Sequence, residues 1–522
     1  MEKKKTTVIT ISATLALILL VATATFAYFQ ADLGNNKEVD VSVSTLTEND
    51  RFSFAVGHPL ALQADETSFV KGGDSVSDTT TATALLTANN KTNNATKYYY
   101  LYLLISQNEF LYSQNENTPE LILTITKPDG TELTTLGGLK HKTVTDGKGT
   151  TIKGFDITTK KGLITIVDNR KITTTSTIEE KWSITLTLVN YDVNQIDNLG
   201  KMFSSKLIIQ QDEYQYPIAE YLKLQYTGKQ GDNALYYHTR LANGAGDNSY
   251  RYAGASDSVN NYICLGSDAA TCPDANLFRI IGVFGDQTKV IRAKSIRNMK
   301  RDTSSSNTWS SSSLNTYLNG EYLTSLGTLA EKIAITTWKV GGGTVANIQN
   351  SVPATAYQYE VGSSASSTTY EAKIGLMYVS DYYYAAGPSA WTLVGYNSSD
   401  STKDYSAATS TNWLFLGSNE WTISSDSNST LFGFVVTSGH VDSHRLDVWS
   451  YAVRPSFNLL SSVKYVSGSG SMSDPVRVNW LTDSFEKASM KPGQNEVKSS
   501  TNDESFISFF ALWCGYTGCK CS

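Results

Sequence analysis

Residues 30–212 alternate apolar and polar side chains over short stretches. The clearest stretch is Lys181–Val189, where four apolar residues beginning at Trp182 occupy every second position and face one side. A period of two over about eight residues is typical of a β-strand with one buried face. The same pattern predicts strands at Tyr98–Ile105, Leu121–Thr126 and Lys206–Gln210.

The stretch Lys127–Gly130 separates two of these apolar runs and has the composition of a turn, with proline second and glycine fourth. Residues 30–212 contain many such strands and no convincing long helix. We therefore expect a β-sandwich in this first domain.

The pattern changes near Gly231, where glycine, serine and threonine become more frequent and charge falls. We interpret residues 213–232 as a linker and residues 233–478 as a second domain. Leu277–Phe284 and Lys289–Ala293 predict an antiparallel hairpin. Three further strands are expected in this domain, at Lys373–Ser380, Asn412–Trp421 and Tyr451–Leu459.

One helix is predicted in the second domain, at Trp309–Asn319. Leu314 lies on its apolar stripe, and the serine-rich start, which includes Ser312, supplies a cap. The expected fold class is therefore mainly β with a minor α part.

The N-terminal segment has the features of an export signal. Lys3, Lys4 and Lys5 precede an uncharged run from Thr6 to Phe29, and Ala27 marks the expected cleavage position. The alternative is an uncleaved membrane anchor, because the run is about as long as a bilayer requires. Both interpretations place the rest of the chain outside the membrane, so we expect a secreted or cell-surface protein.

Charge and cysteine content narrow the functional classes. The net charge of −6 with scattered basic residues excludes a nucleic-acid-binding stripe. Cys264 and Cys272 enclose a short polar loop, and in an exported chain they predict a disulfide. Cys514, Cys519 and Cys521 are odd in number and leave at least one thiol unpaired within the tail. That tail, residues 479–522, is charged and without periodicity, which favours disorder.

The first domain resembles the TasA/camelysin family of exported bacterial proteins. The resemblance rests on Ala27-Tyr-Phe29, the turn Leu86–Asn90 and the strand Trp182–Val189, in that order. It implies a jelly-roll-like sandwich and assembly into biofilm fibres, in which one subunit donates a strand to the next. The candidate donor is Phe29–Asn35 running into Val39–Val43, although the simpler interpretation makes Val39–Val43 an ordinary first strand of its own domain.

The second domain resembles an uncharacterised bacterial surface domain related to the C-type-lectin and formylglycine-generating-enzyme fold. The resemblance rests on Trp309–Asn319, on Asn412–Trp421 and on the element Val453-Arg454-Pro455. Phe415 stands where related domains often have an arginine, so a salt bridge made by that arginine is in doubt. We interpret Arg454 as structural, pairing or stacking inside the fold.

A C-type-lectin-like fold implies ligand recognition by exposed loops between the last strands, here Ser424–Trp449. The candidate ligand-binding residues are Trp421, Asp426, Asn428, Phe434, His440, Asp442, His444 and Trp449. The ligand would be a glycan or a protein. His440 and His444 would gather a metal only if this segment were helical, which Gly439 and Val441 oppose, so no metal and no cofactor are expected.

No catalytic set is recognisable. Camelysin-like proteins have been described as metalloproteases, but the first domain has only His58 and His141 and lacks an HExxH motif. The second domain has no cysteine in the place of a formylglycine oxidase nucleophile and no GxSxG elbow. We therefore expect a non-enzymatic protein of assembly and adhesion. The alternatives are a membrane-anchored ligand-binding receptor and a secreted metallohydrolase.

Overall fold

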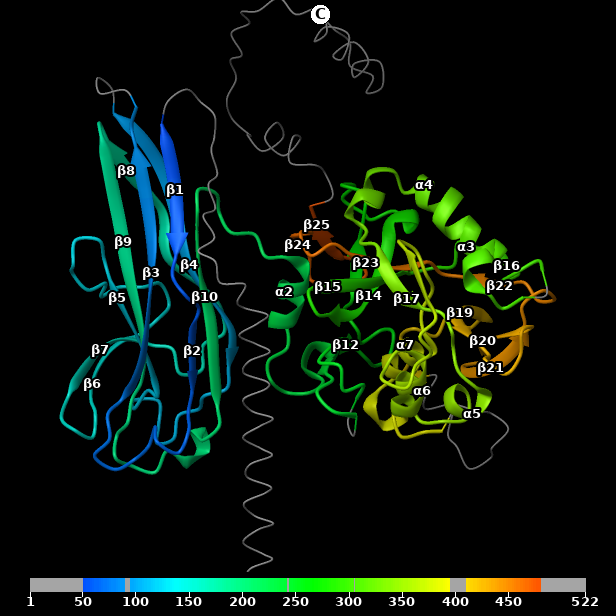
Figure 1. Cartoon of the computed structure of the whole chain (residues 1–522), viewed down its shortest axis with the longest axis horizontal. Helices are drawn as coiled ribbons and strands as arrows, with labels where there is room; N and C mark the ends of the chain where they lie inside the picture. The colour runs from blue at the N-terminus through cyan, green and yellow to red at the C-terminus, as the bar shows by residue number, and fades with distance from the viewer. Residues whose placement is uncertain (1–49, 90–93, 242–243, 305, 395–409, 480–522) are drawn as a thin grey trace, which may run out of the picture.

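The computed structural model describes residues 50–89, 94–241, 244–304, 306–394 and 410–479. It is mainly β, with several antiparallel sheets and short helices (Figure 1). The export segment with Ala27, the candidate donor Phe29–Val43 and the tail with Cys514, Cys519 and Cys521 lie outside the described residues. Within the described part, no helix is long and apolar enough to cross a membrane.

Two hydrophobic cores organise the chain. One gathers residues between Phe52 and Ile209, and the other gathers residues between Ile218 and Val478. We use the names first domain and second domain for the parts built around these cores. The predicted linker 213–232 contains a helix, α2 (Ile218–Leu224), whose Ile218, Ala219 and Leu222 are buried in the second core.

The first domain consists of two antiparallel sheets, which lie side by side in Figure 1. One has the order β1-β3-β9-β5-β7-β6 and the other β2-β10-β4-β8. The strands are β1 (Arg51–Val56), β2 (Leu60–Gln63), β3 (Val76–Thr87), β4 (Ala95–Asn108), β5 (Leu121–Thr126), β6 (His141–Thr145), β7 (Thr151–Asp156), β8 (Gly162–Thr174), β9 (Thr177–Leu188) and β10 (Met202–Gln210).

The strand predictions for this domain are confirmed. In β9, Trp182, Ile184 and Leu186 are buried at every second position, as the alternation requires. The turn at Lys127 is present, since the Gly130 amide donates to the Lys127 carbonyl oxygen at 2.9 Å. The alternation of apolar and polar residues was enough to identify these strands because each sheet buries only one face.

The core of the first domain also contains a polar cluster. The Tyr99 hydroxyl donates to the Glu180 carboxylate at 2.5 Å, and the Trp182 indole N–H donates to that hydroxyl at 2.9 Å. Arg170 contacts both oxygens of Glu180 at 2.7 Å. Because each buried polar atom has a partner, the cluster joins β4, β8 and β9 without an unpaired charge.

The second domain contains three sheets. Among the described residues, their orders are β11-β12-β14-β13-β25-β24 with β15 paired to β14 and β23 paired to β15, then β16-β22-β19-β20-β21, then β17-β18. The strands are β11 (Leu235–Tyr237), β12 (Tyr250–Tyr252), β13 (Tyr262–Cys264), β14 (Leu277–Phe284), β15 (Gln287–Arg292), β16 (Arg297–Met299), β17 (Thr336–Lys339), β18 (Thr369–Ala372), β19 (Glu420–Ser425), β20 (Phe432–Thr437), β21 (His440–Arg445), β22 (Tyr451–Val453), β23 (Ser456–Leu459), β24 (Tyr465–Ser467) and β25 (Val476–Val478).

Several predictions for this domain are confirmed. β14 and β15 form the expected antiparallel hairpin. Cys264 and Cys272 form a disulfide. The predicted helix begins with a 3₁₀ turn at Trp309–Ser311 and continues as α3 (Ser313–Tyr317), with the Ser312 hydroxyl accepting from the Asn315 amide. A π-helical turn at Leu318–Tyr322 leads from α3 to α4 (Leu323–Ser325).

Two strand predictions are wrong. Lys373–Ser380 is not a strand: its buried residues run through the core with one bridge, between Gly375 and Ser456. The helix α7 (Val379–Ala385) then begins, because the Asp381 carboxylate accepts from the Tyr378 amide at 2.8 Å and caps it. Asn412–Trp421 is mostly turn, and β19 starts only at Glu420.

Besides α2 and α7, two further helices in the described residues were not predicted, α5 (Val345–Ile348) and α6 (Pro353–Glu360). α6 begins with a proline at its first turn, which is a common helix start. α5 is too short for a periodic pattern to reveal it.

Tyrosines of the connecting segment contact both domains. The Tyr216 hydroxyl accepts from the Leu163 amide of β8 at 3.2 Å, and the Tyr214 amide donates to the Tyr102 hydroxyl of β4 at 3.2 Å. The Tyr214 hydroxyl in turn donates to Glu220 of α2 at 2.6 Å. The helix that opens the second core is thereby attached to the four-stranded sheet of the first domain.

Candidate functional site

The predicted ligand-binding residues lie on or beside the sheet β16-β22-β19-β20-β21. The segment Ser424–Trp449, which we expected to be an exposed loop, is mostly the hairpins β19–β20 and β20–β21. Ser438 and Gly439 connect β20 to β21 with φ angles of 48° and 89°. Two left-handed residues between antiparallel strands make a tight hairpin turn, so this segment is not helical.

Buried arginines hold β19 in place. Arg454 contacts both carboxylate oxygens of Glu420, at 2.6 and 2.7 Å, and donates to the Leu414 carbonyl oxygen at 2.6 Å. Arg301 donates to the Ile423 carbonyl oxygen at 2.7 Å. Arg454, which we interpreted as structural, is 1% exposed and does not reach a surface. Its neighbour Pro455 is also buried.

An aromatic stack crosses the sheet from its interior to its surface. Trp449 is 52% exposed and its ring is nearly parallel to that of Tyr451, with centroids 6.4 Å apart. Tyr451 contacts Trp421 at 5.0 Å. Trp421 is fully buried and donates to the Met299 carbonyl oxygen, so it supports the stack and does not contact ligand.

His440, Asp442 and His444 share one face of β21 because they are two residues apart. His444 contacts Asp442 at 3.2 Å and the Tyr451 hydroxyl at 2.6 Å through its two ring nitrogens. The hydrogen bond from His444 lowers the pKa of Asp442, and burial lowers the pKa of His440. These histidines are therefore packed side chains and not solvated loop residues.

Both oxygens of the Asp442 carboxylate are engaged by neighbouring side chains. Across the described ranges, no three histidine, cysteine or carboxylate side chains are close enough to hold an ion. Gln349 takes one oxygen of Asp442 at 3.2 Å while His444 takes the other.

The turn between β19 and β20 is fixed by two side chains from outside it. Asn307 donates to the carbonyl oxygens of Asp426 and Ser429, at 3.1 and 2.8 Å. The Asp426 carboxylate accepts from the Asn428 amide at 3.0 Å and from the Ser443 hydroxyl at 3.1 Å. Asp426 is 6% exposed and thus shapes the turn, whereas Asn428 is exposed.

A pocket of about 360 Å³ lies beside this turn, and we name it the polar groove. Ten of its thirteen lining residues carry a hydroxyl or a carboxamide, and none is charged. Trp309 also lines it, and the Trp309 indole N–H is buried without a hydrogen-bond partner in the described part of the chain. The lining residues used below are Thr308, Ser310, Thr369, Ser427, Asn428 and Thr430.

The structure thus separates the predicted site residues into three groups. Trp421 and Phe434 are fully buried and Asp426 is 6% exposed, so the assignment of these three side chains as ligand contacts was wrong. His440, Asp442, His444 and Trp449 lie on or beside the edge hairpin. Asn428 alone of the predicted residues lines the polar groove.

Sequence reasoning missed most of the polar groove. Trp309 and Ser310 were interpreted only as the start of a helix, and Thr308, Thr368 and Thr369 carry no local motif. The groove forms because four segments more than 25 residues apart in sequence meet there, around 308, 340, 368 and 428. The sequence pattern within each segment cannot show that these segments meet in the folded chain.

No protein-family model matches the chain, and a comparison with curated proteins found no match.

Proposed function

We propose that the chain is an exported bacterial surface or biofilm-matrix protein acting in assembly and adhesion, and that its second domain binds a neutral glycan in the polar groove. The observation that carries this proposal is the lining of the groove, which offers ten hydroxyl or carboxamide side chains and no charge. The protein is non-enzymatic and needs no cofactor in this proposal.

The lining chemistry favours a sugar over a charged ligand. Neutral donors and acceptors replace the water around sugar hydroxyls, whereas an ion would lose hydration without gaining an opposite charge.

The first domain is proposed to be a TasA/camelysin-like jelly roll that assembles by strand addition. Its two sheets and their shared core support this assignment. The proposed donor, Phe29–Val43, precedes β1 in sequence. For the second domain, the parallel pairing of β13 with β25 supports a C-type-lectin-like fold, because it closes the domain between an early strand and its last strand.

The disulfide Cys264–Cys272 supports export, because such bonds persist in oxidising surroundings. The proposed location is therefore secreted or at the cell surface, with membrane attachment if the N-terminal segment is retained.

Glycan binding is tested with immobilised neutral polysaccharides and the double variant Asn428→Ala, Thr369→Val. Both side chains are exposed in the groove, so the fold is retained while two hydrogen-bonding groups are lost. We expect affinity to fall at least about tenfold. The control is Trp449→Ala, which lies outside the groove and leaves binding unchanged. Equal binding by the double variant, or loss only with Trp449→Ala, contradicts the proposal.

Assembly is tested by electron microscopy of the chain starting at Tyr28 against a chain that starts at Asp50. Fibres are expected only from the longer chain, because the shorter one lacks the donor. Fibres from both chains would exclude Phe29–Val43 as the donor.

A further inference from the structure

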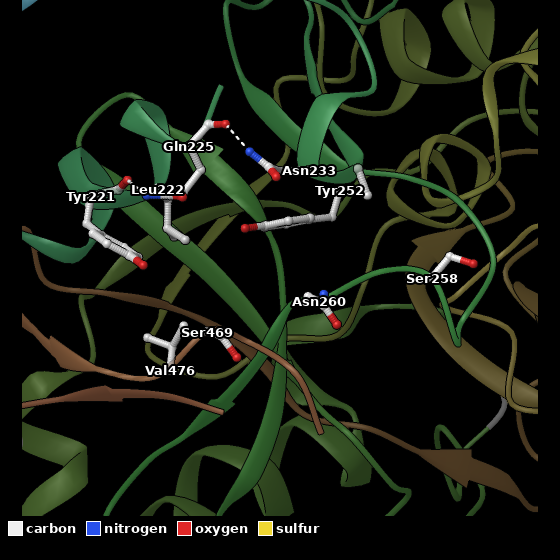
Figure 2. A pocket seen from close by; sticks show the side chains of 10 residues that line it. Tyr221, Leu222, Gln225, Asn233, Tyr252, Ser258, Asn260, Ser469 and Val476 are labelled. Atoms are coloured by element: carbon white, nitrogen blue, oxygen red, sulfur yellow. Dashed lines mark hydrogen bonds between the residues drawn. The ribbon is translucent and has the colours of Figure 1, made fainter. Parts of the chain in front are cut away.

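A second cavity lies away from the polar groove and shares none of its lining residues. Its volume is about 290 Å³, and it lies where α2, the segment before β11, β12 and the β24–β25 hairpin converge (Figure 2). Small-molecule sites begin at about 300 Å³, so this cavity has the size for one sugar ring. We name it the α2 cavity.

Tyr252 forms the floor of the α2 cavity. It is only 5% exposed, and Figure 2 shows its hydroxyl pointing into the space among Leu222, Asn233 and Asn260. No hydrogen bond in the described ranges uses this hydroxyl, and burial raises its pKa, so it stays protonated as a donor. The hydroxyl faces the cavity and is therefore available to donate a hydrogen bond to a ligand atom there.

The walls and rim of the cavity are neutral, with carboxamide and apolar groups side by side. Gln225, Asn233 and Asn260 supply the carboxamides. The Asn233 side-chain nitrogen donates to the Gln225 carbonyl oxygen at 2.7 Å, which leaves the Asn233 side-chain oxygen facing the cavity region (Figure 2). The apolar groups are Leu222, Ala234 and Val476.

The backbone beside the cavity is held in an unfavourable conformation. Asn233 and Ala234 have φ angles of 55° and 57°, in the left-handed region, which an alanine adopts only at a cost in free energy. Strain of this kind persists where surrounding contacts fix it and is common at ligand sites. The wall is therefore preorganised before a ligand arrives.

We propose that the α2 cavity binds a neutral sugar residue carrying an acetamido group. Its hydroxyls meet the Tyr252 hydroxyl and the rim residues Ser258 and Ser469, both exposed. Its amide meets the carboxamides, and its methyl group meets the apolar wall at Leu222 and Val476. A charged sugar is excluded because none of the lining residues carries a charge to replace its hydration.

The test uses the intact chain and saturation-transfer NMR with N-acetylglucosamine as the probe. Glucosamine, which carries an ammonium group in place of the acetamide, is the charged control. We expect N-acetylglucosamine to bind and glucosamine to bind more weakly. Tyr252→Phe removes only the hydroxyl and raises Kd about three- to tenfold.

Asn260→Trp is the second variant, because Asn260 is exposed on the rim and a tryptophan there fills the entrance without disturbing the core. We expect it to abolish binding while the thermal unfolding midpoint is retained. Asn428→Ala in the polar groove leaves N-acetylglucosamine binding unchanged.

Three results overturn the inference: no binding of N-acetylglucosamine, unchanged binding by both Tyr252→Phe and Asn260→Trp, or loss of binding with Asn428→Ala alone. The last result places the sugar in the polar groove and leaves the proposed function standing. If the polysaccharide test fails while N-acetylglucosamine still binds, the proposed function is wrong and the inference about the α2 cavity stands.

Discussion

Arg454 and Glu420 form a buried ion pair with two contacts, and this pair joins the residue after β22 to the first residue of β19. Each residue is 1% exposed. The pair fixes the position of β19, the strand that leads into the turn beside the polar groove. The position of Asn428 therefore depends on a contact eight residues earlier in the chain.

Arg454→Met is expected to lower the free energy of unfolding by about 3 to 5 kcal/mol, because it leaves the Glu420 carboxylate buried without a partner. Urea unfolding followed by tryptophan fluorescence measures the change. The matched control is Arg445→Met, whose pair with Asp447 lies at the surface, and it should have little effect. Equal effects of the two variants would contradict the structural role of Arg454.

Replacing Cys264 and Cys272 together by serine is expected to lower the free energy of unfolding of the second domain by roughly 2 to 3 kcal/mol, because the closed loop is short. Urea unfolding with and without reductant checks this. Reductant should destabilise the native chain and leave the double variant unchanged. A native chain insensitive to reductant would argue against the disulfide.

The stability of the second domain should depend on pH through His238. Its ring is fully buried against Tyr384 and Trp391, and desolvation lowers its pKa from 6.5 to about 3. Below pH 6.5 the His238 side chain binds a proton in the unfolded chain, whereas in the folded chain it stays neutral. The free energy of unfolding therefore falls by about 1.4 kcal/mol per pH unit from this group as the pH drops from 6.5 towards 3.

His238→Gln removes that titration. Between pH 6 and pH 4 the free energy of unfolding of this variant should therefore change less steeply with pH than that of the native chain, by the contribution of about one proton. Urea midpoints across the pH series provide the measurement. Parallel curves for both proteins would show that His238 is not the group responsible.

Ser312→Ala is expected to cost about 1 kcal/mol, since the Ser312 hydroxyl accepts from the Asn315 amide at the start of α3. Ser311→Ala, one position earlier and exposed, is the control and should change stability much less. Thermal unfolding of the two variants compares them directly. A larger effect at Ser311 would mean that the helix begins elsewhere.

Local pattern predicted four strands of the first domain, which the structure shows as β4, β5, β9 and β10, because its sheets have one buried and one exposed face. β9 shows this most clearly, since Trp182 and its alternate neighbours are all buried. The same reasoning failed at Lys373–Ser380. A buried segment is apolar on all sides whether it is a strand, a helix or irregular chain, so composition alone cannot separate these states.

The candidate site was harder to predict than the fold. Asn428 was identified because it lies in a turn, but Phe434 was misassigned because its neighbours suggested a loop and not a strand. Tyr252 gave no sequence signal at all: its importance rests on the cavity that α2 and the β24–β25 hairpin form around it. Only the assembled chain brings these segments together.

The contact between Tyr216 and Leu163 bears on how subunits can join. β8 is the outermost strand of its sheet, and the Leu163 amide on it is already occupied by the Tyr216 hydroxyl. An incoming strand could not form a continuous hydrogen-bond ladder along β8 without displacing the connector. The interdomain segment thus covers the Leu163 end of this sheet border, so a strand that added along the whole of β8 would have to displace it there.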